Sequence, residues 1–152
     1  MAGEKEPTGL PGEYPYAGSV RMNADLRAEL VRLCSAGLPN EACGVAGGRP
    51  GEIVRLYPLT NVSASHERYT VDVDEQMDAY RAMADDDLEC VAVFHSHPAT
   101  PARPSRTDIA EAYDPDALYV IVSFAAEAPS VRAFTIRDGS VSETTIETEA
   151  PA

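Results

Sequence analysis

The segment CVAVFHSHPATPARPSRTD, Cys90–Asp108, organises the rest of the chain. It begins with an apolar run typical of a buried β-strand, reaches His-Ser-His-Pro, crosses a proline-containing loop and ends at a predicted helix start. Side chains two apart on a strand point to the same face. His95 and His97 can therefore direct their rings to one point while Ser96 faces away.

Two aligned imidazoles are part of a metal site, because zinc and similar divalent ions take three or four protein ligands. Asp108, at the start of the predicted helix, can supply a carboxylate and leave a further position for water. A structural interpretation is also open, because Ser105 and Asp108 fit a helix capping box. The two interpretations are compatible, since the geometry that fixes the helix start can also hold the carboxylate beside the histidines.

The pattern resembles the JAMM (MPN-plus) metalloproteases, and in particular the bacterial stand-alone Mov34/MPN/PAD-1 proteins. The likeness rests on His-Ser-His-Pro, the proline-rich spacer, Pro-Ser-x-x-Asp at residues 104–108 and the upstream run NEACGV at residues 40–45. It extends from about Val20 to Ile146. The motif is specific, because its residues agree with the family pattern both in residue type and in their order along the chain.

The resemblance implies a zinc cofactor and roles for five residues. His95, His97 and Asp108 would be the metal ligands. Glu41 would pass a proton from the attacking water to the leaving amine, and Ser105 would donate to the developing oxyanion. The implied reaction is hydrolysis of an amide or isopeptide bond at the C-terminus of a small ubiquitin-like sulfur-carrier protein, with release of an added residue such as cysteine.

Alternative functions fit the sequence less well. A serine hydrolase built on Ser96 or Ser105 lacks a nucleophile-elbow sequence and gives the second histidine no task. A catalytically silent MPN interaction domain would lose the histidines or the aspartate that this chain keeps. An isopeptidase acting on other protein conjugates stays open. Glu41 also has a structural interpretation, as a solvent-facing carboxylate at a strand start.

The composition limits the class of partner. The chain has 25 acidic and 12 basic side chains, a net charge of −13 and no cluster of Lys or Arg, so we expect no nucleic-acid partner. No stretch approaches the roughly 18 apolar residues of a membrane span, and no signal peptide is visible, so we expect a cytoplasmic protein without membrane contact. The three cysteines, which lie in apolar segments, are expected to be reduced and buried: Cys34, Cys43 and Cys90.

The 152 residues correspond to one domain. Residues 1–18 are rich in glycine, proline and charge, so we expect a disordered N-terminal tail. The metalloprotease-like domain should span residues 19–147, with a C-terminal tail at 148–152. The element order predicts an α+β fold, a curved mixed β-sheet flanked by helices, as the resemblance also implies.

Hydrophobic periodicity and capping residues give the expected elements. The second helix should be capped by Asp74 and bury Met77, Tyr80 and Ala84, and Asp138-Gly139 should form a two-residue hairpin turn. Helices are expected at residues 24–36, 75–84 and 105–113. Strands are expected at residues 19–22, 41–46, 53–57, 68–73, 89–94, 117–124, 131–137 and 140–146.

Overall fold

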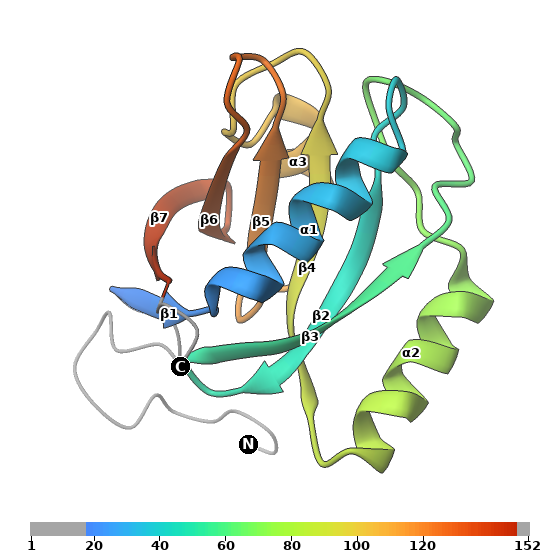
Figure 1. The fold of residues 1–152 in the computed structure, drawn as a ribbon, viewed down its shortest axis with the longest axis vertical. Helices are drawn as coiled ribbons and strands as arrows, with labels where there is room; N and C mark the ends of the chain where they lie inside the picture. Colours follow the sequence, from blue (N-terminus) through green and yellow to red (C-terminus); the bar gives the residue numbers. More distant parts are fainter. Residues whose placement is uncertain (1–17, 149–152) are drawn as a thin grey trace.

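One closed mixed sheet with three helices makes up the described residues, 18–148, of this computed structural model (Figure 1). The helices are α1 (Ala24–Ala36), α2 (Val73–Asp85) and α3 (Arg106–Glu111). The strands are β1 (Ser19–Arg21), β2 (Cys43–Arg49), β3 (Glu52–Leu59), β4 (Glu89–His97), β5 (Leu118–Ser123), β6 (Ser130–Arg137) and β7 (Ser140–Glu147).

The strand order is β1-β3-β2-β4-β5-β6-β7, and β7 pairs back onto β1. The pairs β1–β3, β4–β5 and β1–β7 are parallel and the other pairs are antiparallel. The predicted mixed α+β fold is thus confirmed. The sheet is more closed than predicted, because the three-residue β1 bridges two distant strands, and so short a strand gives almost no periodic signal.

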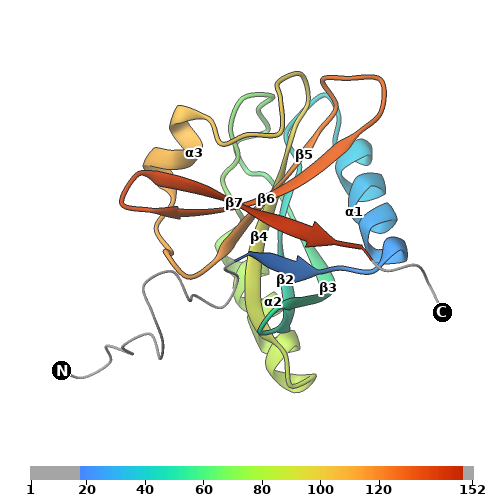
Figure 2. The same ribbon diagram turned by 90° about the vertical axis from the view of Figure 1, so that its left-hand side faces the viewer.

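Helices cover both faces of the sheet, and Figure 2 shows α1 and α3 on opposite sides of it. On one face, Leu26 and Leu30 of α1 pack in a cluster with Phe94 of β4. On the other face, Met83 of α2 belongs to a cluster with Val93. The continuous apolar run of β4 is therefore buried on both faces, as predicted. Because His95 and His97 alternate in step with Val93, they face the side that carries α2 and α3.

Helix α2 differs from its prediction in its start and its buried face. Asp72, not Asp74, is the N-cap, and its side chain accepts a hydrogen bond from the Glu75 N–H at 3.0 Å. The buried residues are Ala79 and Met83, one helical turn apart, whereas Met77 is 45% exposed. The predicted inner face was wrong for Met77 and Ala84, which are exposed, whereas Tyr80 is partly buried against the same cluster as Met83. Packing against β2 and β4 decides which stripe of the helix is buried, and the amphipathic pattern is too broad to decide it.

The predicted strand at residues 68–73 is a loop that leads into α2. It makes a single isolated bridge, between Val71 and Asn61, and joins no sheet strand. Tyr69, Val71 and Val73 alternate as in a strand, but this alternation does not come from pairing in the sheet. Tyr69 and Val71 are partly buried against the α2-side cluster, whereas Val73 is 65% exposed at the start of α2.

The cysteines are free thiols, but only two of the three are buried. Burial raises the pKa of Cys34 and of Cys43 to about 12, so both stay protonated. Cys90 is exposed, which corrects its prediction as a buried residue. It lies near the start of β4, where β2 pairs with it at Gly47 but the pairing with β5, which begins at Ala92, has not started.

The turn between β6 and β7 confirms the predicted Asp138-Gly139 hairpin. Both residues have positive φ, 48° and 79°, as a type I′ turn requires. No helix among the described residues is long and apolar enough to cross a membrane. The predicted tails, residues 1–18 and 148–152, lie almost wholly outside the described range, so the domain boundaries stay predictions.

Gly44 in β2 lets Phe94 pack directly on the backbone. A Cβ at Gly44 would lie 2.3 Å from the Phe94 ring and 2.5 Å from the Tyr57 carbonyl oxygen. Both positions are occupied by groups that cannot move freely, so Gly44→Ala should lower the free energy of unfolding by roughly 1–3 kcal/mol. Urea unfolding of both proteins measures this difference, and an unchanged midpoint and slope would contradict it.

Candidate metal centre and active site

The three predicted ligands meet where β4 ends and α3 begins. His95 Nε2 and His97 Nε2 are 3.1 Å apart, and Asp108 Oδ2 lies 3.1 Å from the first and 3.0 Å from the second. Both imidazoles are buried, and the Asp108 side chain is only 9% exposed. Atoms at these spacings can each lie about 2.0–2.2 Å from one ion. The structure therefore brings together a group able to hold a metal.

The charge state of the group fits a divalent cation. Burial lowers the pKa of His95, so its imidazole is neutral and has a lone pair. Burial acts on the pKa of His97 in the same direction, but the hydrogen bonds to Asp108 and to the Pro101 carbonyl outweigh it and raise that pKa, so a cation held here would replace the proton that these acceptors favour. Burial opposes ionisation of Asp108, but hydrogen bonds from His95 and His97 outweigh it and lower the pKa of that carboxyl well below its usual range. Two imidazole nitrogens and one carboxylate are a donor set typical of zinc and related metals. The cluster therefore indicates a metal ion.

Hydrogen bonds with neighbouring groups hold His97 and Asp108 in their orientations. His97 Nδ1 lies 2.8 Å from the Pro101 carbonyl oxygen, so that Nδ1–H donates there and Nε2 keeps its lone pair for a metal. The Ser105 N–H donates to Asp108 Oδ2 at 2.9 Å, and Ser105 Oγ accepts from the Asp108 N–H at 3.0 Å. The capping box is thus present, and it aims the same carboxylate oxygen at the histidines.

Ser96 faces away from the group formed by His95, His97 and Asp108 (the metal group), as predicted. Its Oγ accepts a hydrogen bond from the Ala42 N–H at 2.8 Å, and its own N–H donates to the Ala42 carbonyl at 3.0 Å. These bonds attach the end of β4 to the residue after Glu41. Since its hydroxyl lies on the face opposite the histidines, Ser96 is not placed to be a nucleophile beside them.

Glu41 lies across from His97. The β2–β4 register pairs Cys43 with His95, and the Ala42–Ser96 bonds continue it by one residue, so the next pair is Glu41 with His97. Directly opposed side chains share a face of the sheet. Glu41 is 6% exposed, and its Oε1 is buried without a hydrogen-bond partner among the residues that the structure describes. The interpretation of Glu41 as a solvent-facing carboxylate is therefore wrong.

The buried setting of Glu41 suits proton transfer. Burial raises the pKa of Glu41 to about 7, and the opposing attraction of His97 does not cancel it. An unpartnered buried oxygen is costly unless another group completes it. A water held beside the His-His-Asp group would be such a partner, so the orphaned Oε1 also fits a site built around a metal.

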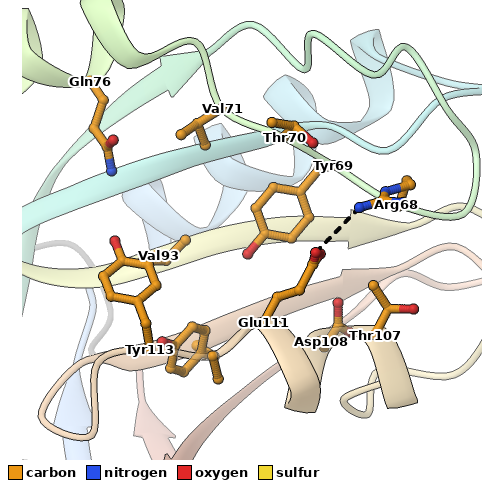
Figure 3. Close-up of a pocket in the computed structure, with 12 residues that line it drawn as sticks. Arg68, Tyr69, Thr70, Val71, Gln76, Val93, Thr107, Asp108, Glu111 and Tyr113 are labelled. Carbon is orange, nitrogen blue, oxygen red and sulfur yellow. Dashed lines mark hydrogen bonds and ion pairs between the residues drawn. The ribbon is translucent and has the colours of Figure 1, made fainter.

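A cavity of about 190 Å³ adjoins Asp108 (Figure 3). It lies between the segment 68–71 and α3, and in Figure 3 the Tyr69 ring extends from that segment toward α3. Arg68 and Glu111, 3.3 Å apart, form an ion pair that connects the two walls. The lining is aromatic and aliphatic as well as polar, and it includes Asp108 of the His-His-Asp group.

Two residues of the site were not predicted. Tyr69 stacks on His95 with ring centroids 4.5 Å apart and an interplanar angle of 24°. Asn61 hydrogen-bonds the Glu41 carbonyl at 3.0 Å. No local pattern marks either residue, because each contact joins segments far apart in the sequence. His66, the third histidine, is an exposed surface residue whose Nε2 lies 3.5 Å from Glu67 Oε1.

Comparisons with known proteins agree with this geometry. The family model described as prokaryotic homologs of the JAB domain matches residues 23–137. A CysO-cysteine peptidase of Mycobacterium tuberculosis (strain ATCC 25618 / H37Rv) is 42% identical over 125 residues, 80% of this chain and 86% of that protein. A probable TtuB-protein conjugate cleaving protease of Thermus thermophilus is 38% identical over 89 residues, 58% of this chain and 57% of that protein.

Among solved structures, a solution structure of a protein from Desulfitobacterium hafniense superimposes with a TM-score of 0.80 at 36% identity. The match covers 87% of this chain and 94% of that one. The family model spans most of the fold, from the N-cap of α1 to the end of β6. This chain therefore belongs to the family of prokaryotic JAB-domain homologues, the JAMM-like family that its motif resembles.

Proposed function

We propose that this chain is a zinc-dependent peptidase that removes a residue from the C-terminus of a small ubiquitin-like sulfur-carrier protein. The observation that carries the proposal is the buried triangle of His95, His97 and Asp108, with the orphaned Glu41 oxygen on the same face of the sheet. When bound, zinc supplies an acidic water and a Lewis acid for the scissile carbonyl.

Glu41 and Ser105 handle the proton and the oxyanion. Glu41 accepts a proton from the attacking water and returns it to the leaving amine, a task suited to a carboxyl whose pKa burial raises to about 7. Ser105 Oγ accepts the Asp108 N–H, so its own proton stays available to donate to the developing oxyanion. The bond from the Asp108 N–H fixes the position of Ser105 Oγ and thereby orients its hydroxyl group.

The names of the relatives support the class of substrate. The Mycobacterium tuberculosis relative is named a peptidase of CysO-cysteine, and it matches most of both chains. The Thermus thermophilus relative is named for cleaving TtuB-protein conjugates. We infer a substrate in which a carrier protein is joined through its C-terminus to an added residue, with cysteine as the favoured one.

Isopeptide cleavage is the second candidate, and the conjugate-cleaving name of the Thermus thermophilus relative favours it. The two candidates use the same metal group and the same base, and they differ in the leaving amine. A C-terminal extension leaves as an amino acid that carries a free carboxylate, whereas an isopeptide leaves as a lysine side chain. The substrate itself must therefore distinguish them.

The test is a hydrolysis assay with zinc-loaded protein. One substrate is a carrier protein ending in Gly-Gly-Cys, and the other is the same carrier linked to a lysine side chain. We expect mass spectrometry to show faster cleavage of the first. A chelator should abolish cleavage and added zinc should restore it. Full activity after metal removal would refute the proposal and favour a serine hydrolase.

A further inference from the structure

We propose that Asn61 is a positioning residue that holds Glu41 and Tyr69 in the geometry needed for hydrolysis. Asn61 lies two residues after β3, in the loop that leads to α2. A side-chain amide can donate two hydrogen bonds and accept two. Asn61 makes four such bonds, all to backbone groups, so the hydrogen-bonding capacity of its amide is fully used.

Two of these bonds hold the residues on either side of Tyr69. Asn61 Nδ2 donates to the Arg68 carbonyl at 3.0 Å, and Asn61 Oδ1 accepts from the Thr70 N–H at 3.0 Å. The amide thus adds to the backbone bonds of this segment, in which the Val62 N–H donates to the Thr70 carbonyl at 2.8 Å and Asn61 bridges Val71. Because Tyr69 stacks on His95 at 4.5 Å, the two bonds fix an aromatic ring against a predicted metal ligand.

A third bond reaches the proposed base. Asn61 Nδ2 also donates to the Glu41 carbonyl at 3.0 Å, and the Glu41 N–H donates to the Ser65 carbonyl at 2.8 Å. Glu41 precedes β2, which begins at Cys43, so these loop contacts hold its backbone where the strand does not. One amide therefore connects the backbone of the proposed base to the segment that carries Tyr69, in addition to the Ala42–Ser96 bonds that hold the residue after Glu41.

Asn61 is not one of the three metal-ligating residues, so it acts through its neighbours. A displacement of about 1 Å of a reacting group can reduce a rate by about 100-fold. This inference rests on the proposed peptidase function. It adds that the catalytic rate depends on an amide outside the His-His-Asp group, beyond what that amide contributes to folding.

The variant Asn61→Asp tests the two donor bonds that connect Asn61 with Glu41 and Arg68. Aspartate keeps the size and the two acceptor bonds to the loop, but it loses both donors and places a carboxylate against the carbonyls of Glu41 and Arg68. The matched control is Ser63→Ala, which removes the 2.8 Å bond between Ser63 Oγ and Thr70 Oγ1 in the same loop without touching Glu41.

Each variant is assayed for kcat per bound zinc, for Tm and, after cobalt substitution, for its visible absorption spectrum. We expect Asn61→Asp to lower kcat at least about tenfold and to shift the cobalt spectrum, because Tyr69 no longer fixes His95. Ser63→Ala should stay within about twofold of the wild type with the same spectrum. Equal losses of kcat in both variants, or a wild-type kcat and spectrum in Asn61→Asp, would overturn the inference.

The readouts separate this inference from the proposed function. If the wild type cleaves no carrier substrate, the proposed function fails, yet the cobalt spectra still test whether Asn61 sets the geometry of the metal group. Should Asn61→Asp not fold, the wild type supplies the test by NMR. Its Asn61 Nδ2 protons should then exchange with water at least about tenfold more slowly than those of a free amide, and unprotected exchange would refute the four-bond arrangement.

Discussion

Replacing Glu41 with glutamine is expected to lower kcat by about 10²–10⁴ while zinc stays bound. Glutamine has nearly the same shape as glutamate but cannot accept the proton of the attacking water. Glu41 Oε1 has no hydrogen-bond partner among residues 18–148, so the substitution breaks no bond of that atom within this part of the chain. The loss should appear in kcat on the carrier-cysteine substrate, with zinc content measured by mass spectrometry.

The matched control is Glu67→Gln, which makes the same change of charge on an exposed neighbour. Glu67 interacts electrostatically with Glu41, and its side chain is 77% exposed. We expect kcat within about threefold of the wild type, because exposed charges are screened by solvent. Turnover by Glu41→Gln at the wild-type rate would remove Glu41 from its role, and equal losses in both variants would point to a general effect of charge.

The part of the site that lies within one segment could be predicted from the sequence. His95 and His97 share a face because of the two-residue period of a strand, and the apolar run before them predicted the buried β4. Asp108 could be placed nearby because the capping pattern fixed a helix start after a short loop. These inferences succeed because they depend on neighbours in the chain.

The parts that depend on distant segments could not be predicted in the same way. Glu41 faces His97 only because β2 pairs with β4 in one register, which no local pattern specifies. Tyr69 alternates like a strand residue, but its segment pairs only through an isolated bridge and through the Asn61 amide, which no local pattern specifies. Closure of the sheet by the short β1 and the exposure of Cys90 likewise follow from which strands become neighbours.

Asp108→Asn is expected to abolish tight zinc binding while α3 stays folded. The asparagine Oδ1 can still accept the Ser105 N–H, so the capping box survives. The neutral amide, however, no longer supplies the negative charge that faces His95 and His97 at 3.1 and 3.0 Å. Zinc affinity should fall by more than about 100-fold, and cleavage of the carrier substrate should become undetectable.

Thermal and urea unfolding with and without zinc measure this effect, because a ligand at about 100 times its Kd stabilises the folded state by about 2.7 kcal/mol. The wild type should show that gain and Asp108→Asn should show almost none. Ser105→Ala is the contrasting variant: it loses the helix cap, at about 1 kcal/mol, but keeps all three ligands and therefore keeps its zinc-dependent gain. A zinc-dependent gain in Asp108→Asn as large as that of the wild type would show that the carboxylate only caps the helix, and the metal would then have to be held without it.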